Sequence, residues 1–575
     1  MMHKIAKFPL NFPLWFTLIL FGAMSLFVGL HGQFAVNDDW VFVRQVEAFL
    51  SGQWAISSVI DPSFISQGLV GYVWGSVFGV SFESLRTLTL LLTVVFLVVV
   101  SKVLDLLEVS EKTKLAVLLL VAFNPLIFTS AFSFMTEIYF LLFFVLGIYF
   151  YLRSFQDEDR KGSRSNHSVV ANIFLGSLFT GLAILVRQVG IVGFVAYFLS
   201  ALYFKKLNVK NFLVALVPVI SSIGIFSLWP RYLDEGVSNS FTGLLSNLIS
   251  SEQIYGRLTK MLWSLPYFVF FMMPLVFFSK KKQHLSAWVG VLGLAVVLAL
   301  ATQLFKLDIF PVGSVFYIEG LHVKSDFRSN FHIFNNVIFK EFLAVLISLA
   351  AVRLTLLFKF KPKLNSQSLF LLLNFLGSFA VLFFGNDFYD RYLLPAFLSL
   401  LLFVVYYFRD VIEFQTKFQW AALILIIVIS VLHQHEFISH TRLRWQQAML
   451  IQQETGIVNG IYVDGTYGKY FNALSEDDYK GEVSGESAGE YECYVQEYTM
   501  DTNSIAFHFG QWADKTSQRL IENPDIYEAK RSTELPKIKN NLDKLIHNES
   551  YFSLESYLVG KEAWVGSWCK TDSQN

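Results

Sequence analysis

The chain has 575 residues, of which 54% are hydrophobic and only 16% are charged. Soluble domains usually carry about 25% charged residues, so this composition excludes an ordinary soluble protein and indicates a membrane protein with many spans. The 45 Lys and Arg residues balance the 45 Asp and Glu residues, and this net charge of zero leaves no basic field that would attract nucleic acid. The two cysteines are too few for a disulfide-rich secreted scaffold.

Long apolar runs recur along the first three quarters of the chain. We expect about thirteen transmembrane helices, because each crossing of a hydrocarbon layer needs roughly 20 residues. They fall at 12–31, 84–103, 115–132, 138–152, 170–186, 189–204, 212–229, 262–278, 285–303, 336–358, 367–385, 393–408 and 418–433. The first run follows Lys4 and Lys7 and has no convincing cleavage site after it, so it is predicted to be an uncleaved signal anchor.

Basic residues gather in alternate loops. They include Lys102, Lys112, Lys114, Arg153, Arg160, Lys161, Lys205, Lys206, Lys280, Lys281, Lys359, Lys361 and Arg409. Because Lys and Arg accumulate in cytoplasmic loops, this pattern predicts a multi-pass protein of the cell (inner) membrane with a cytoplasmic amino terminus. The loops near 32–83, 130–137, 230–261, 304–335 and 386–392, and the carboxyl terminus, would then face outward.

The composition changes after residue 433, where long apolar runs stop. We therefore divide the chain into a transmembrane domain, 1–433, and an extracytoplasmic soluble domain, 434–575. This tail carries 13 Lys and Arg against 22 Asp and Glu. Alternating apolar residues at 460–464 and 556–560 predict strands, and apolar residues at helical spacing predict a helix over 534–547. The tail is thus expected to be a small α/β domain.

Both cysteines, Cys493 and Cys569, lie in this tail. If the predicted orientation holds, they face an oxidising compartment, where pairing is favoured. They are therefore a disulfide candidate. Two buried free thiols are the alternative.

An acidic pair, Asp38 and Asp39, opens the first outward loop. The apolar residues of 42–50 that follow recur at helical spacing, with polar residues between them and Gly52 as a stop. This pattern predicts an amphipathic helix in the plane of the interface. Capping of the helix accounts easily for one carboxylate and less well for two. The functional alternative is a general base that takes a proton from an acceptor hydroxyl or amine.

A third carboxylate, Glu137, stands in the outward turn that begins at Asn124 and Pro125 and leads into an apolar helix. An ionised carboxylate at the bilayer centre costs about 3 kcal/mol on insertion scales. We therefore expect Glu137 at the membrane edge or facing a polar cavity. With Thr136 it could instead cap the helix.

Two arginines stand at membrane-edge positions, Arg187 and Arg391. Ionisable residues there are functional candidates, and a guanidinium donates two parallel hydrogen bonds that suit a phosphate. Alternatively, Arg391 pairs with Asp387 or Asp390. No phosphate-binding loop, dinucleotide motif or zinc-protease motif accompanies them, and the cluster of His433, His435 and His440 is explained as well by interfacial polarity as by a metal.

Several motifs together resemble the membrane glycosyltransferases of the GT-C superfamily, similar to protein O-mannosyltransferases and the lipid A aminoarabinose transferase (glycosyltransferase family 39). The motifs that carry the resemblance cover roughly residues 1–410. They are Asp38-Asp39-Trp40 through Gly52, Phe78-Gly79-Val80-Ser81, Leu85-Arg86, Pro125, Thr136-Glu137, Arg187-Gln188 with Gly190, and Arg391-Tyr392-Leu393-Leu394-Pro395.

The resemblance implies a polytopic GT-C-like fold and an inverting transfer of a sugar from a polyprenyl-phosphate donor to a glycan, lipid or protein acceptor on the extracytoplasmic face. It implies that Asp38 is the general base, Asp39 its partner or an acceptor-positioning group, and Glu137 a second acid of the same cavity. Arg187 and Arg391 would bind the donor phosphate. No metal-binding residues are predicted, and a divalent metal stays open as a cofactor.

The chain also departs from these relatives. Many of them have Asp-Glu where this chain has Asp38-Asp39, and His or Lys followed by two prolines where it has Ser66-Gln67-Gly68-Leu69. Three other classes are alternatives: a lipid or glycan transporter, an O-antigen polymerase or ligase, and a sensor whose tail does the recognition. A transporter would show inverted repeats or broken helices, and polymerases and ligases place their functional residues in a late outer loop rather than in the first.

Overall fold

The computed structural model of the chain describes most of the membrane part and the strands of the tail. The described residues are 11–36, 38–57, 60, 62–159, 166–231, 251–276, 316–317, 320–321, 337–357, 362–384, 389–412, 414, 416–455, 461–462, 493–501, 504–506, 547–551 and 562–569.

The membrane part is built from helices. Those of its first half are α1 (Phe12–Val28), α2 (Asp39–Leu50), α3 (Ser66–Phe78), α4 (Phe82–Leu106), α5 (Glu111–Ala122), α6 (Pro125–Ser130), α7 (Thr136–Asp159), α8 (Asn166–Ile184), η1 (Gln188–Gly190), α9 (Ile191–Tyr203) and α10 (Val209–Leu228). Its second half holds α12 (Ser251–Val276), α14 (Val337–Leu357), α15 (Ser366–Val381), η3 (Leu382–Phe384), η4 (Asp390–Leu393), α16 (Leu394–Tyr407) and α17 (Lys417–Thr455), with the short strands β1 (Phe316–Tyr317) and β2 (Gly320–Leu321).

Seven helices within the described ranges are long and apolar enough to cross a membrane. They are Phe82–Leu106, Thr136–Asp159, His167–Ile184, Val209–Leu228, Gly256–Leu275, Asp390–Tyr407 and Lys417–Glu454, and four shorter apolar helices accompany them, Phe12–Val28, Gln188–Tyr203, Ala344–Leu354 and Ser366–Val381. The multi-pass helical class is thus confirmed. The structure does not establish the expected thirteen spans, and the expected span at 285–303 lies outside the described residues.

One expected span, 115–132, is divided in two. Helix α5 ends at Ala122, and the side chain of Asn124 then accepts a hydrogen bond from the Leu126 backbone N–H at 3.0 Å. Pro125 follows as the first residue of α6, a position where its missing N–H costs nothing. Hydropathy does not register this break because the residues on both sides of it are apolar.

The predicted helix after the acidic pair is present as α2. It ends at Leu50, before Gly52, which has a φ of +88°. Most apolar residues of α2 are buried, and its closest helical neighbour is α3. Gly71 of α3 permits this close approach, since a Cβ there would lie 2.8 Å from Val46 of α2.

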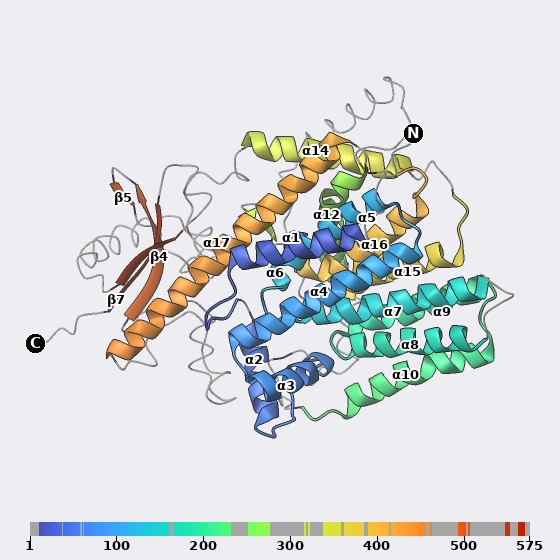
Figure 1. Cartoon of the computed structure of the whole chain (residues 1–575), viewed down its shortest axis with the longest axis horizontal. Coiled ribbons are helices and arrows are strands. Elements are labelled where there is room, and N and C mark those ends of the chain that lie inside the picture. The colour runs from blue at the N-terminus through green and yellow to red at the C-terminus, as the bar shows by residue number, and fades with distance from the viewer. Residues whose placement is uncertain are drawn as a thin grey trace, which may run out of the picture.

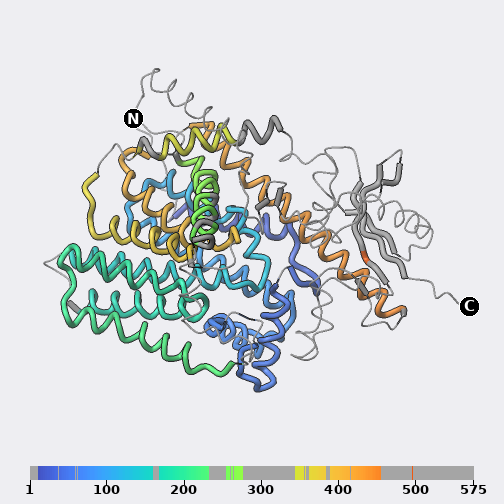
Figure 2. Tube along the Cα trace, turned by 180° about the vertical axis from the view of Figure 1, so that it is seen from behind, coloured from blue at the N-terminus to red at the C-terminus, as the bar shows by residue number. Residues whose placement is uncertain are grey.

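The spanning helices pack side by side as the tube and cartoon views show (Figures 1 and 2). Helix α7 contacts α4 on one side and α8 on the other, and α8 contacts α10. Helix α15 contacts α16 and α9. The buried core between them is rich in Leu, Val and Phe, with Tyr139 and Tyr151 fully enclosed. This arrangement brings together the ends of helices that are far apart in the sequence.

Helix α17 joins the bundle to the tail. It has 39 residues and is therefore about 58 Å long. Within the bundle its Gln434 accepts a hydrogen bond from Thr129 of α6 at 2.8 Å, and Ser430 donates to the Phe123 carbonyl. Its far end contacts strands of the tail (Figure 1).

The tail contains a five-stranded sheet of β3 (Ile461–Tyr462), β4 (Cys493–Asp501), β5 (Ser504–Ala506), β6 (His547–Tyr551) and β7 (Glu562–Cys569). The order is β3-β4-β7-β6, with β5 also paired to β4. Strands β3 and β4 run parallel, and the other pairs are antiparallel. The strand predicted at 460–464 is present as β3. The predicted strand 556–560 and helix 534–547 lie outside the described residues, so the α/β class and the domain boundary stay predictions.

Candidate active site

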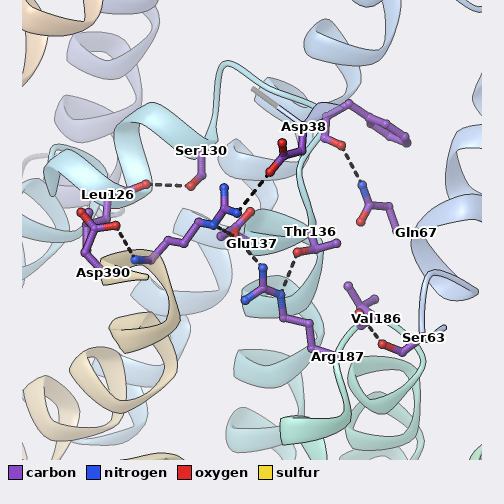
Figure 3. Close-up of polar contacts among 12 residues, drawn as sticks. Asp38, Ser63, Gln67, Leu126, Ser130, Thr136, Glu137, Val186, Arg187 and Asp390 are labelled. Atoms are coloured by element: carbon purple, nitrogen blue, oxygen red, sulfur yellow. Dashed lines mark hydrogen bonds and ion pairs between the residues drawn. The ribbon is translucent and has the colours of Figure 1, made fainter. Parts of the chain in front are cut away.

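Four side chains predicted from the sequence meet in one ion-pair cluster, which we call the acid–arginine cluster: Asp38, Glu137, Arg187 and Arg391. Figure 3 labels the first three of them. Arg187 Nη2 lies 2.6 Å from Glu137 Oε1. Arg391 Nε lies 3.4 Å from the same oxygen, and Arg391 Nη2 lies 3.5 Å from Asp38 Oδ2. Asp38 and Arg391 are 353 positions apart in the chain, so only the tertiary fold can create this site.

Both carboxylates of the cluster stand at the start of a helix and face the arginines. Asp38 is the N-cap residue of α2, but its side chain makes no capping hydrogen bond. Glu137 stands in the first turn of α7, where its carboxylate turns to the two arginines. Capping by the side chain therefore does not account for Asp38. The helix dipole still favours a negative charge at both places.

Arg187 is held between α8 and η1. Its Nε donates to the Thr136 hydroxyl at 2.7 Å, and its guanidinium carbon lies 4.8 Å from the centre of the Tyr392 ring. Gly190 permits this close turn, since a Cβ there would lie 2.7 Å from the backbone nitrogen of Ile184. The predicted motif of Arg187 with Gly190 thus has a steric basis.

Arg391 lies in η4, just before α16. Its backbone N–H donates to Asp390 Oδ1 at 2.7 Å, whereas its side chain reaches Asp38 and Glu137. The ring of Tyr389 lies 5.0 Å from its guanidinium carbon. Asp390 therefore fixes the backbone of Arg391 and leaves the guanidinium to the cluster. Asp387, the other partner considered from the sequence, lies outside the described residues.

Exposure changes steeply across the acid–arginine cluster. The side chain of Asp38 is 55% exposed, that of Arg391 is 9% exposed and that of Glu137 is 2% exposed. Glu137 Oε2 is buried and has no hydrogen-bond partner among the described residues. The two carboxylates and two guanidinium groups sum to zero formal charge. The cluster thus combines an accessible carboxylate, a buried carboxylate, the buried Arg391 and the partly buried Arg187.

Asp39 is placed differently from its neighbour. It is buried, and its Oδ1 accepts the backbone N–H of Val36 at 2.9 Å. This contact anchors the approach to α2. The acidic pair therefore divides into an exposed carboxylate in the cluster and a buried one behind it, and a catalytic part for Asp39 stays a prediction.

Sequence reasoning missed several residues that hold the site. Gln67 Nε2 donates to the Phe134 carbonyl at 3.0 Å, just ahead of Glu137. Ser63 Oγ donates to the Val186 carbonyl at 3.1 Å, just ahead of Arg187. Gln67 belongs to the segment 66–69, where the sequence departs from that of the resembling enzymes. This departure is the sequence signal that could have identified Gln67.

Within the described ranges, no group of three or more His, Cys, Asp or Glu side chains could hold a metal ion. The sheet of the tail bears on the disulfide candidate. Cys493 and Cys569 stand directly opposite each other in the antiparallel register of β4 and β7. This register brings the two backbones together but does not establish the bond.

Residues 73–207 match the family model for dolichyl-phosphate-mannose-protein mannosyltransferase (PMT). This segment is less than half of the chain and includes Arg86, Glu137 and Arg187. The match confirms the predicted resemblance to a GT-C membrane glycosyltransferase. No curated protein sequence and no solved structure gave a significant match to the chain.

Proposed function

We propose that the protein transfers a sugar from a polyprenyl-phosphate donor to an acceptor on the extracytoplasmic face of the membrane, with inversion at the anomeric carbon. The observation that carries the proposal is the acid–arginine cluster, in which an exposed carboxylate lies 3.5 Å from a buried guanidinium. The family name adds mannose as the sugar to test first. Glycosyl transfer needs a base for the acceptor and cations for the leaving phosphate, and the cluster holds both.

Arg391 and Arg187 would bind the donor phosphate. A guanidinium offers a planar fork of donors that matches phosphate oxygens. Both are paired with Glu137, so a phosphate would enter as a further anion beside two cations. As the bond between the sugar and the phosphate breaks, negative charge develops on the phosphate, and preorganised cations stabilise it.

Asp38 would act on the acceptor. It is the exposed carboxylate of the cluster and can take the proton of an acceptor hydroxyl or amine as that group attacks the anomeric carbon from the face opposite the phosphate. Displacement from the opposite face inverts the configuration. Glu137 would hold the two arginines in place, since its Oε1 contacts both of them.

The predicted orientation supports a site on the extracytoplasmic side. The cluster brings together the amino-terminal ends of α2, α7 and α16 and the carboxyl-terminal end of α8. The predicted cytoplasmic loops, rich in Lys and Arg, follow α7 and α16 and precede α8, at the ends of these three helices that lie away from the cluster, and this supports an outward-facing site.

The test uses the purified full chain in lipid vesicles with polyprenyl-phosphate mannose and a crude acceptor fraction. We expect mannose to appear on an acceptor with the anomeric configuration opposite to that of the donor, measured by nuclear magnetic resonance. Retained configuration would overturn the single-displacement mechanism. Movement of intact donor lipid across the vesicle without sugar transfer would instead support a transporter.

A further inference from the structure

Arg86, near the amino-terminal end of α4, is almost entirely buried, with 1% of its surface exposed. None of the roles described above uses it. A buried guanidinium is costly unless its donors find acceptors, so its contacts are informative.

The donors of Arg86 reach backbone carbonyls in two separate segments. Nη1 donates to the Leu30 carbonyl at 2.9 Å and lies 3.5 Å from that of Gly32, and Nη2 donates to the Phe34 carbonyl at 2.9 Å. Nε donates to the Phe132 carbonyl at 3.0 Å. The ring of Phe34 also lies 4.1 Å from the guanidinium carbon.

Each segment leads directly to one carboxylate of the acid–arginine cluster. Residues 30–34 precede Asp38, and Phe132 stands in the turn between α6 and α7 that delivers Glu137. We propose that Arg86 is a positioning residue, which holds these two segments in register so that Asp38 and Glu137 meet the same arginine. The expected effect on kcat rests on the proposed function, whereas the expected effect on the position of the two segments does not.

Only arginine suits this task among the cationic side chains. Its fork directs donors to several carbonyls at fixed angles, whereas a lysine offers its donors from a single nitrogen. The buried carboxylate of Asp39 interacts electrostatically with this guanidinium and binds Val36 N–H in the same segment. Asp39 therefore extends the attachment to Val36, two residues before Asp38.

The structural arm of the test measures hydrogen–deuterium exchange in full-length Arg86→Lys and Arg86→Ala. We expect faster exchange in both 29–36 and 130–136. The matched control is Thr87→Ala, since the Thr87 hydroxyl donates to Glu83 within its own helix and reaches neither segment. Faster exchange in only one segment, in neither, or equally in the control would overturn the proposal.

The kinetic arm separates positioning from general damage. Because a misplacement of about 1 Å can cost about 100-fold in rate, we expect kcat of Arg86→Lys to fall by about that factor, with the donor Kd changed less than about threefold. Parallel loss of donor binding and kcat would contradict positioning.

If neither Arg86 variant folds, Phe34→Leu, which removes the ring over the guanidinium, should still raise exchange in 29–36 and lower kcat; an unchanged result would contradict the proposal. If the wild type transfers no sugar, the proposed function fails while the exchange arm still decides the structural claim.

Discussion

Two charged clusters of the bundle differ in how completely their groups are paired. In the first, Lys114 Nζ lies 2.5 Å from Asp105 Oδ1 and 2.5 Å from Asn11 Oδ1, and the Lys114 side chain is 2% exposed. In the acid–arginine cluster, Asp38 is exposed and held by one long contact, and Glu137 Oε2 has no partner among the described residues. The first cluster is arranged like a structural tie between α1, α4 and α5, and the second keeps one carboxylate, that of Asp38, exposed.

The variant of the acid–arginine cluster with the largest expected effect is Glu137→Gln. Glutamine keeps the shape but removes the charge that two arginines share, and removing one partner of a buried pair costs about 3–5 kcal/mol. We expect the free energy of unfolding to fall by about 3 kcal/mol and sugar transfer by more than about 100-fold. Thermal unfolding and the vesicle transfer assay measure the two effects. Wild-type transfer would show that the two arginines do not need this carboxylate.

Arg391→Lys tests the arginine fork with a smaller change. Lysine keeps the charge and loses the paired geometry, so we expect the donor Kd to rise about tenfold, which corresponds to about 1.4 kcal/mol. Equilibrium binding of polyprenyl-phosphate mannose provides the measurement. Arg409→Lys is the matched control, because Arg409 pairs with the exposed Glu108 outside the cluster. Equal losses in both variants would remove Arg391 from the phosphate site.

Asp105→Asn addresses the structural cluster. It removes the counter-charge of Lys114, but Asp105 is 42% exposed and solvent screens the pair, so we expect about 1 kcal/mol of lost stability. Transfer per folded molecule should stay within about twofold of wild type, since such a pair acts on folding alone. A selective loss of kcat at unchanged stability would abolish the distinction between the two clusters.

The cysteines of the tail should have the smallest effect on transfer. Because Cys493 and Cys569 are opposite in β4 and β7 and predicted to face an oxidising compartment, we expect no alkylatable thiol in the unreduced protein. Mass spectrometry before and after reductant gives the result. Two reactive thiols in the absence of reductant would contradict the predicted disulfide. We expect Cys493→Ser to transfer sugar at the wild-type rate.

Much of the bundle could be predicted because lipid imposes a simple requirement, about 20 apolar residues for each crossing. The division of 115–132 at Asn124 and Pro125 escaped this reasoning, since it depends on a local cap among apolar residues. The number of spans stays a prediction, because several of the described apolar helices are shorter than a full crossing.

The site was predictable as a set of residues but not as a geometry. Asp38, Glu137, Arg187 and Arg391 were singled out as charges at membrane edges, and their pairing depends on contacts up to 353 positions apart. The different environments of Asp38 and Asp39 could not be foreseen, since adjacent carboxylates look alike in sequence. In the sequence, Arg86 is only part of a motif. Its contacts are with four backbone carbonyls, and the positions of those carbonyls in space cannot be derived from the sequence.

The central claim is that Asp38 is the base of a sugar transfer. The direct measurement is kcat and donor Kd for Asp38→Asn beside Glu47→Gln, which alters an acid of the same helix that pairs with Arg44 outside the cluster. The account predicts that Asp38→Asn loses transfer by about 100-fold to 10,000-fold with its donor affinity retained, while Glu47→Gln behaves as wild type. Wild-type turnover in Asp38→Asn would contradict it.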